Sequence, residues 1–122
     1  MNAPFVDNSY KWAGGGFLST TEDLLKFGNA MMSHAFLKPE TTSMMFTSQK
    51  LNDGRETRYG IGWFVRQDAK GRRVVTHSGG SMGGTANLLL YPNEGIVVAL
   101  LVNSDQRFIH YAWDIVDIFL GE

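Results

Sequence analysis

The chain has 122 residues, 43% of them hydrophobic and 19% charged, which suits one globular domain with a core of its own. Its formal net charge of -1 and the absence of any basic run argue against nucleic acids and anionic membranes as partners. The lack of cysteine excludes disulfides and thiolate metal sites, and the longest apolar run, Ile96 to Val102, is too short for a membrane span. Residues 1–12 show no secretory-signal pattern, and the sequence predicts neither a cofactor nor a metal site.

The first helix is predicted over residues 20–33. Residues 1–12, which precede it, lack a regular period and predict a looping entry. Ser19 and Glu22 have the spacing of a capping box, which marks a helix start, and Glu22 can pair with Lys26 one turn later. Apolar residues then recur at helical spacing, so one face of this helix is expected to be buried.

A second, short helix is predicted to begin at Pro39, because proline suits the first helical position. Its buried side is expected to consist of three large side chains, Met44, Met45 and Phe46. His34 lies at the end of the first helix and is interpreted as a cap or surface residue rather than a ligand. Residues 47–57 are polar and contain an Asn-Asp-Gly turn, after which the pattern changes from helix to strand.

The second half of the chain predicts an antiparallel meander, because short turns separate its β-type runs. Four strands are expected, over residues 58–66, 73–78, 85–91 and 96–103. The last of them has no polar alternation, which predicts a strand buried on both faces and central in its sheet. A final helix is expected over roughly residues 106–120, capped by Ser104 or Asp105, with an apolar face of Phe108, Ala112, Ile115, Val116 and Phe119.

The most glycine-rich stretch is residues 77–84, HSGGSMGG, which holds four of the fourteen glycines. Such a cluster at a strand end marks a close approach of the backbone to another segment or to a ligand. The imidazole and the two hydroxyls place proton-transfer groups beside backbone N–H donors. A Gly-rich hairpin with one solvated histidine would explain these residues equally well on their own.

Four motifs, in their order along the chain, carry a family resemblance: WAGGGFLST from Trp12, YGIGW from Tyr59, HSGG from His77 and YPNEGIVV from Tyr91. They resemble the second half of the serine β-lactamase and penicillin-binding-protein superfamily, in its class C-like branch. Residues 9–20 and 24–31 are especially similar to mitochondrial serine β-lactamase-like proteins and their bacterial relatives. The resemblance covers nearly the whole chain.

This resemblance implies an α+β fold of the β-lactamase/transpeptidase type. Its expected parts are an antiparallel sheet of about four strands, a C-terminal helix packed on the sheet, and N-terminal helices. Residues 1–50 would be a remnant of the family's all-α subdomain, and residues 51–122 would be part of its α/β subdomain.

The resemblance also implies a catalytic site on the HSGG strand. His77-Ser78-Gly79 matches the family's third motif, which is Lys or His followed by Ser or Thr and then Gly. His77 and Ser78 would contact the substrate or the proton-transfer network, and the Gly80 N–H would be half of an oxyanion hole. Gly79 and Ser81 would bind substrate. A donor aimed at a developing oxyanion typically contributes about 3 kcal/mol.

The chain departs from the family at the nucleophile, which is a Ser-x-x-Lys serine supported by a Tyr-x-Asn tyrosine. None of the eight serines is followed three residues later by lysine. The one Tyr-x-Asn, at Tyr91, falls in a turn after the candidate site strand and is interpreted as a chance match. The chain therefore resembles the C-terminal part of a longer serine hydrolase that acts on an amide, β-lactam, ester or peptide, and it is predicted to be inactive alone.

Two hypotheses stay open from the sequence. The chain is either the substrate-strand part of a serine hydrolase or a non-catalytic scaffold or assembly module that retains a dead site. Under both, strand 96–103 is expected to pair with the missing N-terminal half or with a second copy, because an unpaired apolar edge recruits strands.

Overall fold

The structure is a computed structural model, and it describes residues 4–35, 37–104 and 110–121. Helices precede and follow a run of strands, so the expected α+β class is confirmed. In chain order the elements are the 3-10 helix η1 (Trp12–Gly14), α1 (Thr21–Met32), α2 (Pro39–Met45), β1 (Phe64–Gln67), β2 (Arg73–Ser81), β3 (Gly84–Tyr91), β4 (Ile96–Val102) and α3 (Tyr111–Leu120).

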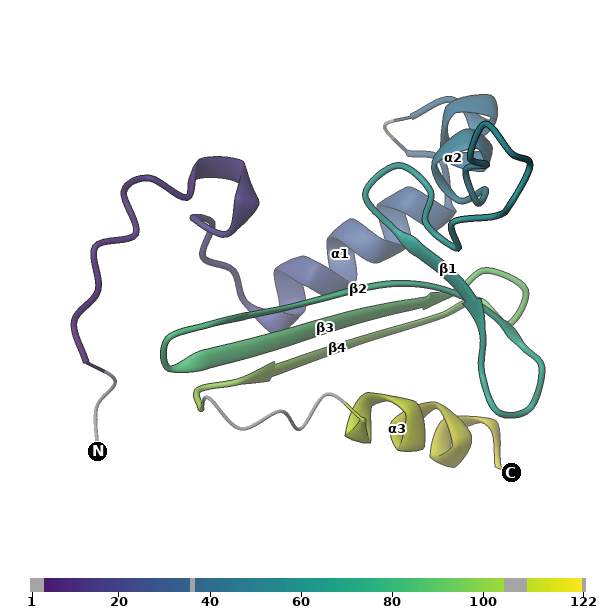
Figure 1. Cartoon of the computed structure of the whole chain (residues 1–122). Helices are drawn as coiled ribbons and strands as arrows, with labels where there is room; N and C mark the ends of the chain where they lie inside the picture. The colour runs from purple at the N-terminus through teal and green to yellow at the C-terminus, as the bar shows by residue number, and fades with distance from the viewer. Residues whose placement is uncertain (1–3, 36, 105–109, 122) are drawn as a thin grey trace.

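The strands form one antiparallel sheet in the order β1-β2-β3-β4, which is the predicted meander. Helix α1 lies along one face of this sheet and α3 along the other (Figure 1). Because neighbouring residues of a strand point to opposite faces, the sheet separates two cores. The core under α1 and α2 contains Met31, Phe46, Trp63, Val75, Leu88 and Leu90. The core under α3 contains Val74, Leu89, Tyr91, Val98, Ala112 and Val116.

Helix α1 begins one residue later than the capping box predicted. Its N-cap is Thr20, whose Oγ1 accepts a hydrogen bond from the Asp23 backbone N–H at 3.1 Å. The Ser19 hydroxyl instead donates to the Thr20 carbonyl at 3.4 Å. The expected Glu22–Lys26 ion pair is present at 2.9 Å. Thr20 is the cap because it lies three residues before an N–H that its oxygen can reach.

The apolar faces of the two shorter helices differ in part from the prediction. In α2, Phe46 at the C-terminus is buried as expected, whereas Met44 is 54% exposed. In α3, Ala112 and Val116 are fully buried, but Phe119 is 78% exposed. These two side chains therefore lie outside the buried stripes of their helices. The predicted cap at Asp105, and with it Phe108, lies outside the described residues.

The strand predicted over residues 58–66 is largely replaced by a loop. Only β1 is regular, and before it Tyr59 and Phe64 form a single bridge. Two residues interrupt the extended backbone, Arg58 with a φ of 57° and Gly62 with a φ of 78°. These positive angles turn the chain out of the sheet and leave Trp63 buried beneath α1.

Strand β4 lies at the edge of the sheet, so the prediction of a central position is wrong for the described residues. It pairs with β3 along its whole length. Helices α1 and α3 both contact it, and at Gly28 of α1 an added Cβ would come within 2.6 Å of Val97 Cγ1. The strand therefore lacks polar alternation because a helix contacts each of its faces.

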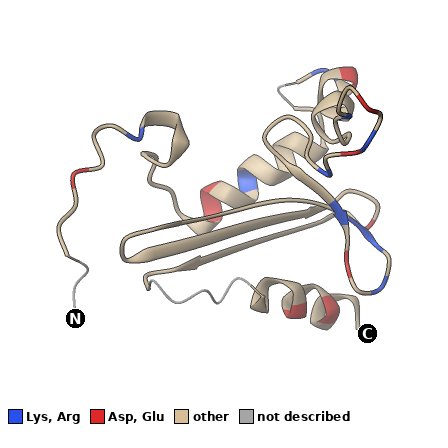
Figure 2. Ribbon diagram, in the orientation of Figure 1, with Lys and Arg blue, Asp and Glu red and all other residues tan. Residues whose placement is uncertain are grey.

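A charged cluster fixes the β1–β2 turn to α3. Arg72 Nε donates to Asp68 Oδ2 at 2.6 Å, and Arg72 Nη2 donates to Asp117 of α3. Burial raises the pKa of Asp68, but the hydrogen bonds from Arg72 and the Lys70 N–H, together with the Arg72 charge, outweigh it and hold that pKa below its ordinary value. Figure 2 shows these charges at the β1–β2 turn and on α3. The opposite end of the sheet, at the β2–β3 hairpin, carries no Lys, Arg, Asp or Glu on either strand from residue 77 to residue 91.

Candidate active site

The glycine-rich stretch forms the end of strand β2 and a tight hairpin to β3. Met82 and Gly83 make a two-residue turn that Ser81 and Gly84 close as a register pair. Gly83 has a φ of 76°, which glycine adopts without steric cost. The candidate site residues 77–81 consequently lie in a regular strand, not in a loop.

The outer edge of β2 is open along these site residues. Strand β1 pairs with residues 73–76, and no strand in the described part of the chain pairs with the outer edge of residues 77–81. In an antiparallel ladder, hydrogen-bonded and non-hydrogen-bonded pairs alternate, and the closing pair of a two-residue turn is hydrogen-bonded. Gly79 is therefore bonded to β3, whereas Ser78 and Gly80 direct their backbone N–H and C=O groups to the open edge.

His77 is held by two aromatic residues from the loop and strand before β2. The Tyr59 hydroxyl lies 2.9 Å from His77 Nε2, and the Phe64 ring centroid lies 5.4 Å from the imidazole centroid. Tyr59 in turn packs edge-on against Phe64, with 4.7 Å between centroids and 82° between planes. The histidine is exposed, so it is neither a core residue nor the freely solvated side chain of the simpler interpretation.

Ser78 points to the opposite face of the sheet from His77, because it is the next residue of the same strand. Its register partner is the buried Asn87. On the same face, the Thr76 hydroxyl lies 3.2 Å from Asn87 Oδ1 and donates to the Leu88 carbonyl at 2.8 Å. The α3 side of the strand thus carries a polar row, and the open backbone edge separates it from His77.

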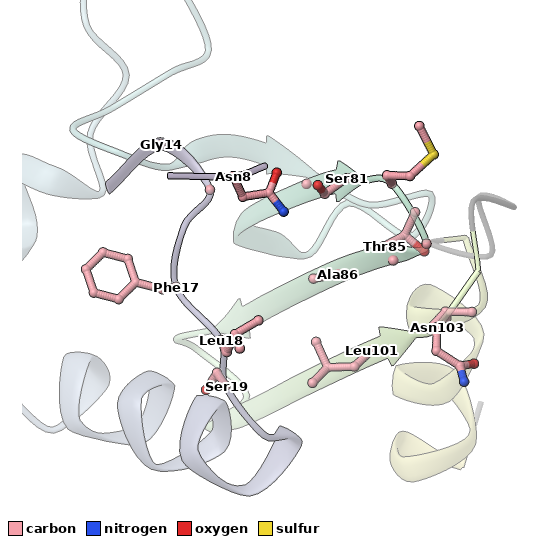
Figure 3. Close-up of a pocket in the computed structure, with 17 residues that line it drawn as sticks. Asn8, Gly14, Phe17, Leu18, Ser19, Ser81, Thr85, Ala86, Leu101 and Asn103 are labelled. Carbon is pink, nitrogen blue, oxygen red and sulfur yellow. The ribbon is translucent and has the colours of Figure 1, made fainter. Parts of the chain in front are cut away.

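A groove of about 710 Å³ lies over the hairpin end of the sheet. Its floor is formed by β2, β3 and the end of β4, and residues 14–19 run across it with Leu18 above Ala86 and Leu101 (Figure 3). Among the predicted site residues, Gly79, Gly80 and Ser81 line the groove, and His77 and Ser78 do not.

Lys11 anchors the N-terminal segment to this hairpin. Its Nζ donates to Ser81 Oγ at 2.8 Å, across 70 residues of sequence. No carboxylate of the described residues forms an ion pair with Lys11. It therefore brings a positive charge to an end of the sheet whose strands have none.

The described residues offer no group of three or more His, Asp or Glu side chains that could hold a metal ion. Within the same residues, no helix combines the length and the apolar character that crossing a membrane requires. The chemistry available at the hairpin end is hydrogen bonding by backbone amides, hydroxyls, the imidazole and the Lys11 ammonium.

Comparison with known proteins identifies the family of this chain. A family model for beta-lactamases matches residues 1–118. The chain belongs to the beta-lactamase family. The human mitochondrial serine beta-lactamase-like protein LACTB is 38% identical to it over an alignment 141 residues long. That alignment covers 84% of this chain and 26% of that protein. The mouse protein of the same name is 37% identical with the same coverage. A penicillin-binding protein of Bacillus subtilis is 28% identical over 88 residues, covering 72% of this chain and 20% of that protein.

The resemblance inferred from the motifs is thereby confirmed at the level of the β-lactamase and penicillin-binding-protein superfamily. The chain spans about a quarter or less of the length of these relatives. The division of the chain at residue 50 and the roles of the individual site residues stay predictions.

Two contacts at the site were not found from the sequence. Lys11 had no assigned role, and Tyr59 was recognised only as part of the YGIGW motif. Their partners, Ser81 and His77, are 70 and 18 residues away, and no local pattern encodes such contacts. The motif around Tyr59 was the one available signal.

Proposed function

We propose that this chain supplies the substrate-binding strand of a serine hydrolase of the beta-lactamase family. The reaction is transfer of an acyl group from an amide, β-lactam or ester to an active-site serine, followed by hydrolysis. The observation that carries the proposal is the open edge of β2, where Ser78 and Gly80 turn their backbone groups away from β3.

Each site residue has a role on this edge. The Gly80 N–H donates to the oxyanion that forms when the serine attacks the acyl carbon. Ser78 and His77 lie on the two sides of the edge and contact the substrate or the proton-transfer network. Gly79 and Ser81 shape the groove beside it, because glycine leaves room for the substrate backbone.

The nucleophile belongs to a Ser-x-x-Lys sequence supplied from outside this chain, since none of its serines has that context. That serine's own backbone N–H would complete the oxyanion hole. The first hypothesis requires substrate to bind at the open edge, and turnover once the nucleophile is supplied separates it from a scaffold with a dead site.

The test is a titration of the ¹⁵N-labelled chain with benzylpenicillin, followed by amide chemical shifts. The Ser78 and Gly80 amides are expected to shift most, and the Gly79 amide less, because its N–H is bonded to β3. Unchanged shifts throughout residues 77–81 at millimolar ligand would contradict the proposal.

Two substitutions at Gly80 give a matched pair. Gly80→Pro removes the outward N–H without breaking a bond to β3, and such edge positions tolerate proline. Gly80→Ala keeps the N–H, and its added Cβ would lie 3.6 Å from the Thr85 methyl, an ordinary contact. Proline is expected to abolish the shifts and alanine to preserve them. With the nucleophile supplied, proline should lower kcat by about 10²- to 10³-fold, the usual effect of losing one oxyanion donor.

A further inference from the structure

Tyr59 makes a long-range contact that the proposed roles of the HSGG strand do not explain. Its hydroxyl lies 2.9 Å from His77 Nε2, within the range of a good O–H···N hydrogen bond. Tyr59 is half-buried and His77 is exposed, so this tyrosine gives a polar partner to an imidazole that is otherwise bordered by Phe64 and by solvent.

The backbone around Tyr59 is fixed by several hydrogen bonds. Its carbonyl accepts from the Gln49 backbone N–H at 2.8 Å and from the Thr57 hydroxyl at 2.9 Å, and its own N–H donates to Thr57 Oγ1 at 3.1 Å. The residue before it, Arg58, has a φ of 57°, a conformation that L side chains rarely adopt. The surrounding loop therefore holds Tyr59 in one place before any ligand arrives.

The ring of Tyr59 is oriented as firmly as its backbone. It packs edge-on against Phe64, and Phe64 also contacts the imidazole. On the Phe64 ring lies the Arg66 guanidinium, 4.4 Å from the ring centroid. These contacts pack the Tyr59 ring in the orientation that directs its hydroxyl at Nε2.

The chemistry of the pair sets the direction of the hydrogen bond. A phenol O–H is a good donor and a poor acceptor, and the unprotonated nitrogen of a neutral imidazole is the strongest acceptor in reach. The favoured bond therefore runs from Tyr59 Oη–H to Nε2. Neutral imidazole carries its one proton on the other nitrogen, so this bond selects the Nδ1–H tautomer.

We propose that Tyr59 is a positioning residue that fixes His77 as its Nδ1–H tautomer. His77 then acts toward a ligand as a hydrogen-bond donor through Nδ1–H, and its basic nitrogen is occupied by Tyr59. The role of that donor in acyl transfer rests on the proposed function, whereas the tautomer is a property of the chain by itself.

The experiment is a long-range ¹H–¹⁵N correlation spectrum of the labelled chain at about pH 8.5, where an ordinary histidine is neutral. An unprotonated ring nitrogen resonates far downfield of a protonated one, so the spectrum identifies the tautomer of each histidine. His77 is expected to show an unprotonated Nε2 and a protonated Nδ1. His34, whose side chain is exposed, serves as the internal reference for an unrestrained ring.

Tyr59→Phe is the decisive variant, because it removes the hydroxyl and keeps the ring that packs on Phe64. It should move His77 to the tautomer mixture of His34. The matched control is Tyr10→Phe at an exposed tyrosine, which should leave His77 unchanged.

A wild-type His77 with the proton on Nε2, or with the same mixture as His34, would overturn the proposal, and so would an unchanged tautomer in folded Tyr59→Phe. The wild-type spectrum decides the question even where the variant does not fold. Failure of benzylpenicillin to bind would reject the proposed function and leave this result standing.

Discussion

Replacing Trp63 with alanine is expected to lower the free energy of unfolding by about 4 kcal/mol. Trp63 is 5% exposed and packs between two aromatic rings. It stacks on Phe27 of α1 with 6.2 Å between centroids, and it meets Phe46 at the end of α2 edge-on at 5.6 Å. Alanine removes both ring contacts and leaves a cavity in the α1 core, which the surrounding structure fills only in part.

The magnitude matters because it approaches the lower end of the usual stability of a small domain, roughly 5–15 kcal/mol. For a chain of this size it corresponds to a drop of about 15 °C in Tm. The loss of Trp63 packing should also destabilise the candidate site, since Trp63 anchors the loop that carries Tyr59. Its carbonyl accepts a hydrogen bond from the Gly60 backbone N–H at 2.7 Å, and Gly60 in turn is packed against the Met45 carbonyl.

The assay is urea and thermal unfolding followed by far-ultraviolet circular dichroism. The matched control is Trp12→Ala, the same substitution at a tryptophan that is 81% exposed, and surface substitutions of this kind usually stay within about 0.5 kcal/mol. If Trp63→Ala is no less stable than Trp12→Ala, then Trp63 does not anchor the core and the account of this loop is wrong.

Two further outcomes follow from the site and from the edge of the sheet. The chain alone should hydrolyse neither a chromogenic cephalosporin nor a p-nitrophenyl ester above the buffer rate, because the members of a catalytic constellation act as a unit. Turnover that Ser78→Ala abolishes would instead make Ser78 a nucleophile. In sedimentation across a concentration series, the chain should form dimers or larger species through the edge of β4, which no strand of the described residues pairs, and Leu101→Lys should weaken this association by placing a charge on the edge strand. A monomer at high concentration, with strongly protected amides in β4, would refute it.

The regular elements could largely be predicted from the sequence, because local patterns encode them. The helix expected over residues 20–33 is α1, shorter by a residue at each end, and the strands expected over residues 85–91 and 96–103 agree with β3 and β4 to within one residue. The strand expected over residues 73–78 continues to residue 81, so the glycines extend β2 instead of ending it.

The errors arise where a single backbone angle or a distant contact decides the structure. The loop before β1 depends on a left-handed Arg58, and propensity does not predict φ above zero for an arginine. The edge position of β4 is not encoded locally, because helices α1 and α3 contact the faces of this apolar strand and leave most of it half-buried. The surroundings of the site depend on Lys11 and Tyr59, whose partners are set by the folded chain.

Strand β1 pairs with only the first half of β2, which limits the length of a ligand that can lie along the edge of β2. An extended ligand on the open half meets the end of β1 at the Phe64–Thr76 pair on one side and the hairpin turn on the other. Between these two stops, only Ser78 and Gly80 present outward backbone groups, about 7 Å apart at the usual rise of a strand. The open edge therefore has room for about three residues of an extended ligand, and a longer ligand must bend away from the sheet.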